Sequence, residues 1–157
     1  MSTRYEFVTR WEIDAPLPAV YDVISRPLEW PQWWRAVVRM VELEPGDADG
    51  VGHLLRSTWR TSLPYGFTFD MRTTRVEKHR LLEAEAVGDL AGIGRWTFEA
   101  HRRRTRIRYD WQVETTKRWM QILAPVARPV FEWNHSVVMG WGLDGLRRRL
   151  RAGGFAT

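Results

Sequence analysis

Residues 66–115, GFTFDMRTTRVEKHRLLEAEAVGDLAGIGRWTFEAHRRRTRIRYDWQVET, decide the fold because they hold four strand-like segments with little chain between them. Apolar and polar residues alternate within the segments, which is typical of β-strands with one buried face. The alternation predicts strands at about 66–78, 80–88, 92–100 and 105–115. Connections this short join antiparallel neighbours, because a parallel pair needs a long crossover. The stretch therefore predicts an antiparallel meander.

The chain before this stretch adds three strands and two short helices. Alternation predicts strands at 4–13, 36–44 and 51–62. Between the first two strands, residues 14–27 carry a possible cap, two early prolines and an apolar helical repeat, which predicts a short helix. The tryptophan-rich residues 29–35 predict a second helical turn.

The last third of the chain predicts helix. Residues 119–123 have a helical pattern, and we expect Pro125 and Pro129 to interrupt it, so that a long helix begins near Pro129 and runs to about Ala152. One face of this helix is predicted to carry Phe131, His135, Val138, Met139, Gly142, Leu146 and Leu150. Only this helix is large enough to cover a seven-stranded sheet, so the sequence predicts an α+β fold.

Length and composition point to a soluble domain. The chain has 157 residues, and we expect one domain over residues 1–157. The absence of cysteine excludes disulfide bonds and thiol catalysis. Residues 1–14 carry charges at short intervals and no apolar segment, so we expect no signal peptide and a cytoplasmic protein. No apolar run approaches the ~18 residues of a transmembrane segment.

Basic residues gather in two clusters, at 101–108 and 147–151, and the formal net charge is +5. A charge run is usually a solvated face, and no motif of a nucleic-acid-binding module accompanies these arginines. We therefore expect no specific nucleic-acid binding. Association with nucleic acid or a membrane surface through these clusters stays an alternative.

Four short motifs occur in an informative order: EIDAP at 12–16, PLEWPQWW at 27–34, GRW at 94–96 and TRIRYDW at 105–111. In this order they resemble the START-like (SRPBCC) superfamily, of the polyketide cyclase/dehydrase and lipid transport type, over nearly the whole chain. The resemblance implies a helix-grip fold: a curved seven-stranded antiparallel sheet around a long C-terminal helix, with two short helices after the first strand. It also implies a cavity between sheet and helix, but no single chemistry.

The sequence holds ten tryptophans, more than a small core needs, so we expect several to line that cavity. Strand parity and the helical face assign the side chains that point inward. The predicted ligand-binding residues are Ser57, Trp59, Phe69, Met71, Trp96, Tyr109, Trp111, Phe131, His135 and Met139. The small residues Ala84 and Ala86 could leave room for a ligand.

His135 is the best candidate for acid–base chemistry, because histidine titrates near neutral pH and this one lies on the inward helical face. Tyr109 could supply a hydroxyl facing it. Asn134 lies about 100° further round the helix, so both need not enter the cavity. The four histidines are scattered and no H-E-x-x-H pattern occurs, so we expect no metal and no cofactor.

Two functions fit these residues. The first is binding of a hydrophobic small molecule that is aromatic, polyketide-like or lipid-like, with the protein as a monomer or homodimer. The alternative is an aromatase/cyclase acting on a polyketide-like substrate, with His135 as acid or base and Tyr109 beside it. We favour binding, because the inward face carries few of the polar groups that proton transfer at carbon requires.

Overall fold

The computed structural model describes residues 4–157 and contains one seven-stranded sheet. Its strands are β1 (Arg4–Ile13), β2 (Val37–Glu44), β3 (Leu54–Arg60), β4 (Gly66–Glu77), β5 (Leu81–Gly88), β6 (Leu90–His101) and β7 (Arg104–Thr115). The strand order is β1-β7-β6-β5-β4-β3-β2, and every neighbouring pair is antiparallel. The predicted meander is confirmed, and β1 joins its far edge beside β7.

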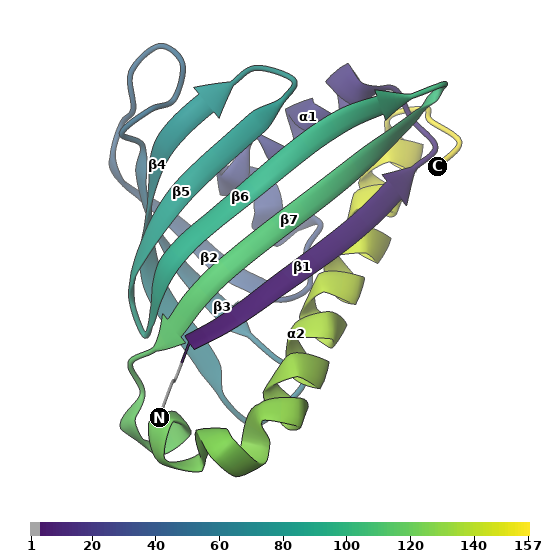
Figure 1. Cartoon of the computed structure of the whole chain (residues 1–157). Coiled ribbons are helices and arrows are strands. Elements are labelled where there is room, and N and C mark those ends of the chain that lie inside the picture. Colours follow the sequence, from purple (N-terminus) through teal and green to yellow (C-terminus); the bar gives the residue numbers. More distant parts are fainter. Residues whose placement is uncertain (1–3) are drawn as a thin grey trace.

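Three helical segments accompany the sheet: α1 (Leu17–Ile24), the 3-10 helix η1 (Pro27–Gln32) and α2 (Arg118–Ala152). The sheet curves around α2, which runs diagonally across its concave side (Figure 1). This arrangement confirms the predicted helix-grip fold. No helix between residues 4 and 157 is long and apolar enough to span a bilayer.

The predicted interruption at Pro125 and Pro129 is wrong, because both prolines lie inside one continuous helix that begins at Arg118. Proline removes one backbone donor and crowds the carbonyl four residues earlier, which bends a helix without necessarily ending it. Both prolines are exposed, so water can reach the carbonyls that lose their partners. The first turns of α2 accordingly lie at an angle to the rest of the helix (Figure 1).

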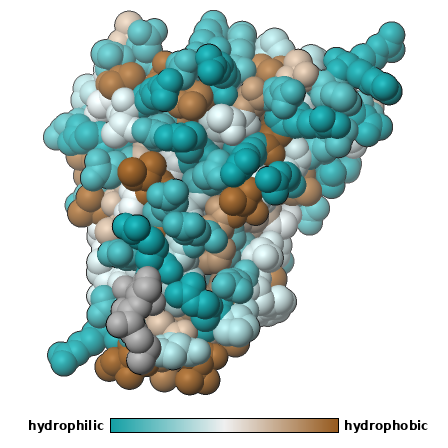
Figure 2. Space-filling model, viewed as in Figure 1, coloured by the Kyte–Doolittle hydropathy of each residue, from teal (hydrophilic) through white to brown (hydrophobic). Residues whose placement is uncertain are grey.

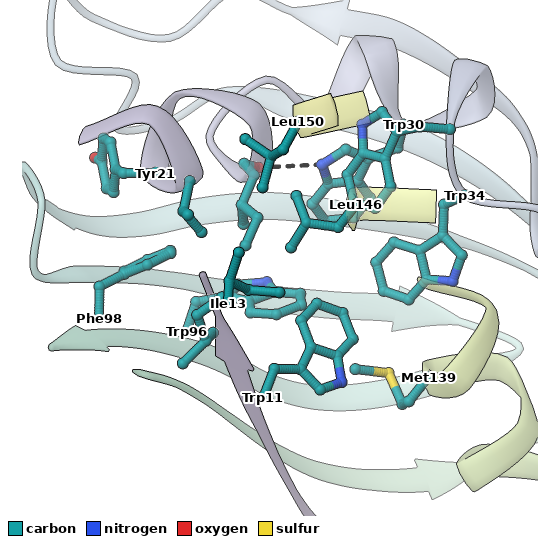
Figure 3. Close-up of a cluster of buried hydrophobic side chains, with 14 of the residues drawn as sticks. Trp11, Ile13, Tyr21, Trp30, Trp34, Trp96, Phe98, Met139, Leu146 and Leu150 are labelled. Carbon is teal, nitrogen blue, oxygen red and sulfur yellow. Dashed lines mark hydrogen bonds between the residues drawn. The ribbon is translucent and has the colours of Figure 1, made fainter. Parts of the chain in front are cut away.

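Tryptophans from η1 and the adjoining turn fix one end of the sheet to α2 (Figure 3). Trp30 Nε1 donates to the carbonyl oxygen of Ile24 (3.1 Å), and Trp34 Nε1 donates to the carbonyl oxygen of Val138 (2.9 Å). Two glycines of α2 make room for this contact. A Cβ on Gly142 would lie 2.6 Å from Trp34 Cε2, and one on Gly145 would overlap the Trp33 carbonyl oxygen.

This close approach predicts a sharp difference between two glycines of the same helix. Gly145→Ala should lower the free energy of unfolding by about 3 kcal/mol, because the backbone at Trp33 must move. Gly140→Ala should leave it unchanged or raise it by about 0.5–1 kcal/mol, because nothing lies near the added methyl and alanine favours helix. Urea unfolding measures both. Equal effects would contradict the packing of α2 on the η1 turn.

Candidate functional site

A cavity of about 530 Å³ lies between the concave face of the sheet and α2. Nine of the ten predicted ligand-binding side chains border it: Trp59, Phe69, Met71, Trp96, Tyr109, Trp111, Phe131, His135 and Met139. Strand parity placed the sheet residues among them, and helical spacing placed the other three. Their predicted role in binding a ligand stays a prediction.

Ser57 is the exception: it is not among the residues that border the cavity, and its role in binding a ligand stays a prediction. It is fully buried in β3, and its hydroxyl donates to the carbonyl oxygen of Phe69 on the neighbouring strand (2.9 Å). Parity points it inward as expected. A side chain this short, however, lies below its larger neighbours Leu55 and Trp59, which do border the cavity.

Aromatic rings form most of the cavity wall. Trp96 and Tyr109 have ring centroids 4.3 Å apart, and Trp59 and Phe69 stack at 6.2 Å. On its other side Phe69 contacts Trp111, with ring centroids 6.1 Å apart. Such rings have few rotatable bonds and offer flat apolar faces, so the wall is suited to a rigid, ring-containing ligand.

Small residues on β5 and β6 make the space in front of these rings. Ala84, Ala86 and Gly94 all border the cavity. A Cβ on Gly94 would lie 2.5 Å from the hydroxyl oxygen of Tyr109, so glycine is what lets that hydroxyl lie over β6. The prediction assigned room to the two alanines; the contribution of Gly94 is visible only from the pairing of β6 with β7.

The interior of the cavity carries no unpaired charge among the described residues. Five of the charged residues that border it are solvent-exposed: Asp22, Asp49, Arg60, Lys78 and Glu85. The sixth, Glu83, pairs with Arg95. A charged ligand group held deep in this space would therefore lose its hydration without gaining a counter-ion.

His135 packs flat against Phe7 of β1, with ring centroids 3.9 Å apart and 11° between the planes. Its Nε2 is buried and has no hydrogen-bond partner among residues 4–157. Burial lowers the pKa of His135 from 6.5 to about 4, so the imidazole is neutral at pH 7. A neutral ring can accept or donate one hydrogen bond, but it is a poor proton donor for catalysis.

Tyr109 does not form an acid–base pair with His135. Its ring lies against Trp96, and no hydrogen bond joins the two residues in the described chain. Burial raises the pKa of Tyr109 above its usual value, so its hydroxyl stays protonated. The structure brings both predicted catalytic residues to one cavity but gives them separate neighbours.

One end of the cavity is polar and was not predicted from the sequence: Tyr5, Tyr65 and Asn134 border it, and Ser62 is hydrogen-bonded to Asn134 behind them. Asn134 is buried and accepts hydrogen bonds from the Ser62 hydroxyl (2.6 Å) and the Ser62 backbone N–H (3.1 Å). Its Nδ2 donates to the Tyr65 hydroxyl (3.3 Å). These bonds fasten the loop between β3 and β4 to α2.

Tyr5 completes this polar end. Its ring contacts Phe131 edge-on at 6.0 Å, and its buried hydroxyl has no partner in the described part of the chain. Burial raises the pKa of Tyr65, the hydrogen bond from Asn134 opposes the rise, and the nearby Tyr5 adds to it. Helical spacing could have found Asn134, because it follows Ala124, Ala127 and Phe131 on the inner face of the bent part of α2.

The arginine clusters lie outside the cavity, and ion pairs within residues 4–157 are formed by three of their nine arginines. Arg104 contacts Glu12 at 3.4 Å, and Arg108 contacts Asp110 at 2.9 Å. In the second cluster, Arg149 contacts Glu29 at 3.1 Å. These ion pairs neutralise part of the positive charge of the clusters at the solvated surface.

Metal binding finds no support in the side-chain arrangement. Over the range 4–157, no three histidine, aspartate or glutamate side chains lie close enough together to hold an ion. His53, which borders the cavity, contacts Glu42 at 2.7 Å.

The buried imidazole predicts a pH-dependent stability. Below pH 6.5 the unfolded chain binds a proton at His135 and the folded chain does not, so the free energy of unfolding falls as the pH drops towards 4. The full effect is on the order of 3 kcal/mol. His135→Gln should lack this part of the pH dependence. Urea unfolding of both proteins between pH 7.5 and pH 4 measures it.

Tyr109→Phe is the matched control, since it removes another polar group from the same cavity. Tyr109 stays protonated throughout this range, so the effect of that substitution should not vary with pH. If the free energy of unfolding falls equally with pH in His135→Gln and in the unaltered protein, the imidazole is solvated in the folded state and the prediction is contradicted.

Comparison with known proteins agrees with this geometry. The family model described as polyketide cyclase/dehydrase and lipid transport matches residues 4–151. Sequence comparison with curated proteins finds no match.

Several solved structures share the fold at low sequence identity. The Zhui aromatase/cyclase from Streptomyces sp. R1128 has a TM-score of 0.77 at 16% identity, over 98% of this chain and 99% of that chain. A START superfamily protein from Mycobacterium smegmatis has a TM-score of 0.75 at 16% identity, over 94% and 97%. A protein from Thermus thermophilus has a TM-score of 0.76 at 16% identity, over 96% and 99%. Likeness at this identity concerns the fold alone.

Proposed function

Because the chain belongs to the polyketide cyclase/dehydrase and lipid transport family, we propose that it binds an uncharged, largely apolar small molecule between the sheet and α2. The observation that carries the proposal is the aromatic-walled cavity of about 530 Å³. Small-molecule sites are typically concave, mostly apolar and of roughly 300–1,000 Å³. A space of this size and lining suits a molecule of two to four fused rings or a comparable lipid better than it suits water.

The unpartnered polar atoms at the cavity indicate which polar group the ligand carries. Three buried polar atoms have no hydrogen-bond partner among residues 4–157: the Tyr5 hydroxyl, the Trp59 Nε1 and the His135 Nε2. All three residues border the cavity. Each such group costs about 1–3 kcal/mol when it is left unsatisfied. A ligand oxygen can accept from the tyrosine and tryptophan donors. Among residues 4–157 the lysine and arginine side chains that border the cavity, Arg60 and Lys78, are solvent-exposed, so that oxygen belongs to a neutral carbonyl or hydroxyl and not to a carboxylate or phosphate.

Binding can be tested with a neutral fluorescent probe and a cavity-filling variant. N-phenyl-1-naphthylamine should quench tryptophan emission saturably, because tryptophans form much of the wall. Ala84→Phe should weaken this binding at least about tenfold, since the added ring occupies the ligand's space. Val87→Phe on the outer face of the same strand, where Val87 is 62% exposed, should bind as the unaltered protein does.

Competition then tests the ligand's charge. At pH 7.4, 2-naphthol should displace the probe at least about tenfold more effectively than 2-naphthoate, because only the carboxylate must give up a full charge's hydration. Unsaturable probe binding, or equal weakening by both phenylalanine variants, would contradict a binding role for the cavity. Preference for the carboxylate would contradict the neutral-ligand part alone.

An aromatase/cyclase activity is the second candidate, and His135 is the observation that favours it. Its unpartnered Nε2 and neutral state leave it able to accept a proton from a bound poly-β-ketone. The low pKa makes it a weak base, which is why we rank this activity second. Turnover of such a substrate that stops in His135→Gln, with probe binding retained, would reverse the ranking.

A further inference from the structure

The first half of α2 carries an apolar stripe on its solvent-facing side. The stripe consists of Trp119, Ile122, Leu123, Val126, Val130 and Trp133, all of which are exposed. Ile122 is 70% exposed and Val126 is 84% exposed. These residues are half of the twelve exposed large apolar side chains in the described chain, gathered within fifteen residues. In Figure 2, hydrophobic residues gather at the lower end of the molecule, where Figure 1 places these turns of α2.

The spacing makes the stripe one continuous surface. Steps of three, one, three, four and three residues keep the six side chains within about 100° of the helix circumference. The solvent-facing side of the second half of α2 is different, because it carries Ser136, Gly140, Asp144 and Arg148. Exposure of large apolar residues is therefore confined to the bent first half of the helix.

The same turns cover one end of the cavity. On their inner side, Met120 and Phe131 are buried and border it. Trp119 belongs to the exposed stripe and also contacts residues that border the cavity. The centroid of one of its rings lies 5.1 Å from that of Tyr65 and 6.4 Å from that of Phe131. A single helix thickness thus separates the stripe from the proposed ligand, and Pro125 and Pro129 weaken the backbone hydrogen bonding of that helix.

The charges beside the stripe have a net positive balance, which favours an anionic surface. Residues 117–133 contain three cations (Lys117, Arg118 and Arg128) and one anion (Glu132), and Lys117 pairs with Asp89 at 3.5 Å. Tryptophans stand at both ends of the stripe and aliphatic residues lie between them. Tryptophan favours the boundary between lipid headgroups and acyl chains, and aliphatic side chains favour the acyl region below it.

We propose that this stripe docks the protein onto an anionic lipid surface, so that the covered end of the cavity faces the membrane. The evidence for docking is the stripe and the charges beside it. The reason for docking rests on the proposed function, because an uncharged apolar ligand is far more concentrated in a bilayer than in water. The helix end then lies where such a ligand can enter or leave.

Vesicle flotation tests the docking without any ligand. The full chain is mixed with vesicles of phosphatidylcholine containing about 30% phosphatidylglycerol, and with vesicles of phosphatidylcholine alone. We expect flotation with the anionic vesicles that weakens with added salt. Ile122→Ser/Val126→Ser should reduce the bound fraction at least about tenfold, because it removes the two most exposed apolar side chains of the stripe. Val38→Ser/Val87→Ser, which removes two exposed valines from the sheet, should float as the unaltered protein does.

Two further measurements fix the interpretation. Probe binding by Ile122→Ser/Val126→Ser should equal that of the unaltered protein, so a failed cavity and a failed docking surface give different results. Light scattering reports whether a second copy covers the stripe instead. No flotation by the unaltered protein, equal flotation by both double variants, or a dimer that Ile122→Ser/Val126→Ser dissociates would overturn the proposal.

Discussion

The structure depends on the contact between two tryptophans that follow η1, Trp33 and Trp34, and two glycines of α2. Trp34 donates to a helix carbonyl 104 residues away, and Gly142 and Gly145 let the helix backbone come within contact of the Trp33–Trp34 segment. This fastens the helix at one end of a curved sheet. The cavity begins beside this contact, where Trp34 and Met139 border it, and extends along α2 to Phe131 and Met120.

The aromatic residues serve two tasks. Trp11 and Trp30 pack against Trp34 in the core and stabilise the fold. Trp30 and Trp34 also border the cavity, as do Trp59 and Trp96, so any ligand contacts side chains that the fold already holds in place. Such a preorganised wall loses little conformational entropy on binding. The same aromatic wall is compatible with binding or with catalysis, because the choice between them depends on the few polar groups in the cavity.

Residue pattern predicted the sheet and nine of the side chains that border the cavity, because alternation fixes which side of a strand faces the helix. It failed where a local rule competes with tertiary structure. Proline was expected to end the helix, yet Pro125 and Pro129 only bend it. Strand parity predicted that the Ser57 side chain points towards the helix. It could not predict that the larger side chains of Leu55 and Trp59 border the cavity and that Ser57 does not. The polar end was missed because Asn134 meets Ser62 and Tyr65 only through a loop 69 to 72 residues away in sequence.

The proposed function requires that the cavity select neutral apolar molecules. Native mass spectrometry tests this selectivity, with the purified protein mixed with an equimolar set of ring compounds that differ only in a hydroxyl, a ketone or a carboxylate. We expect one-to-one complexes with the hydroxyl and ketone members. Complexes with the carboxylates alone, or with no member of the set, would contradict it.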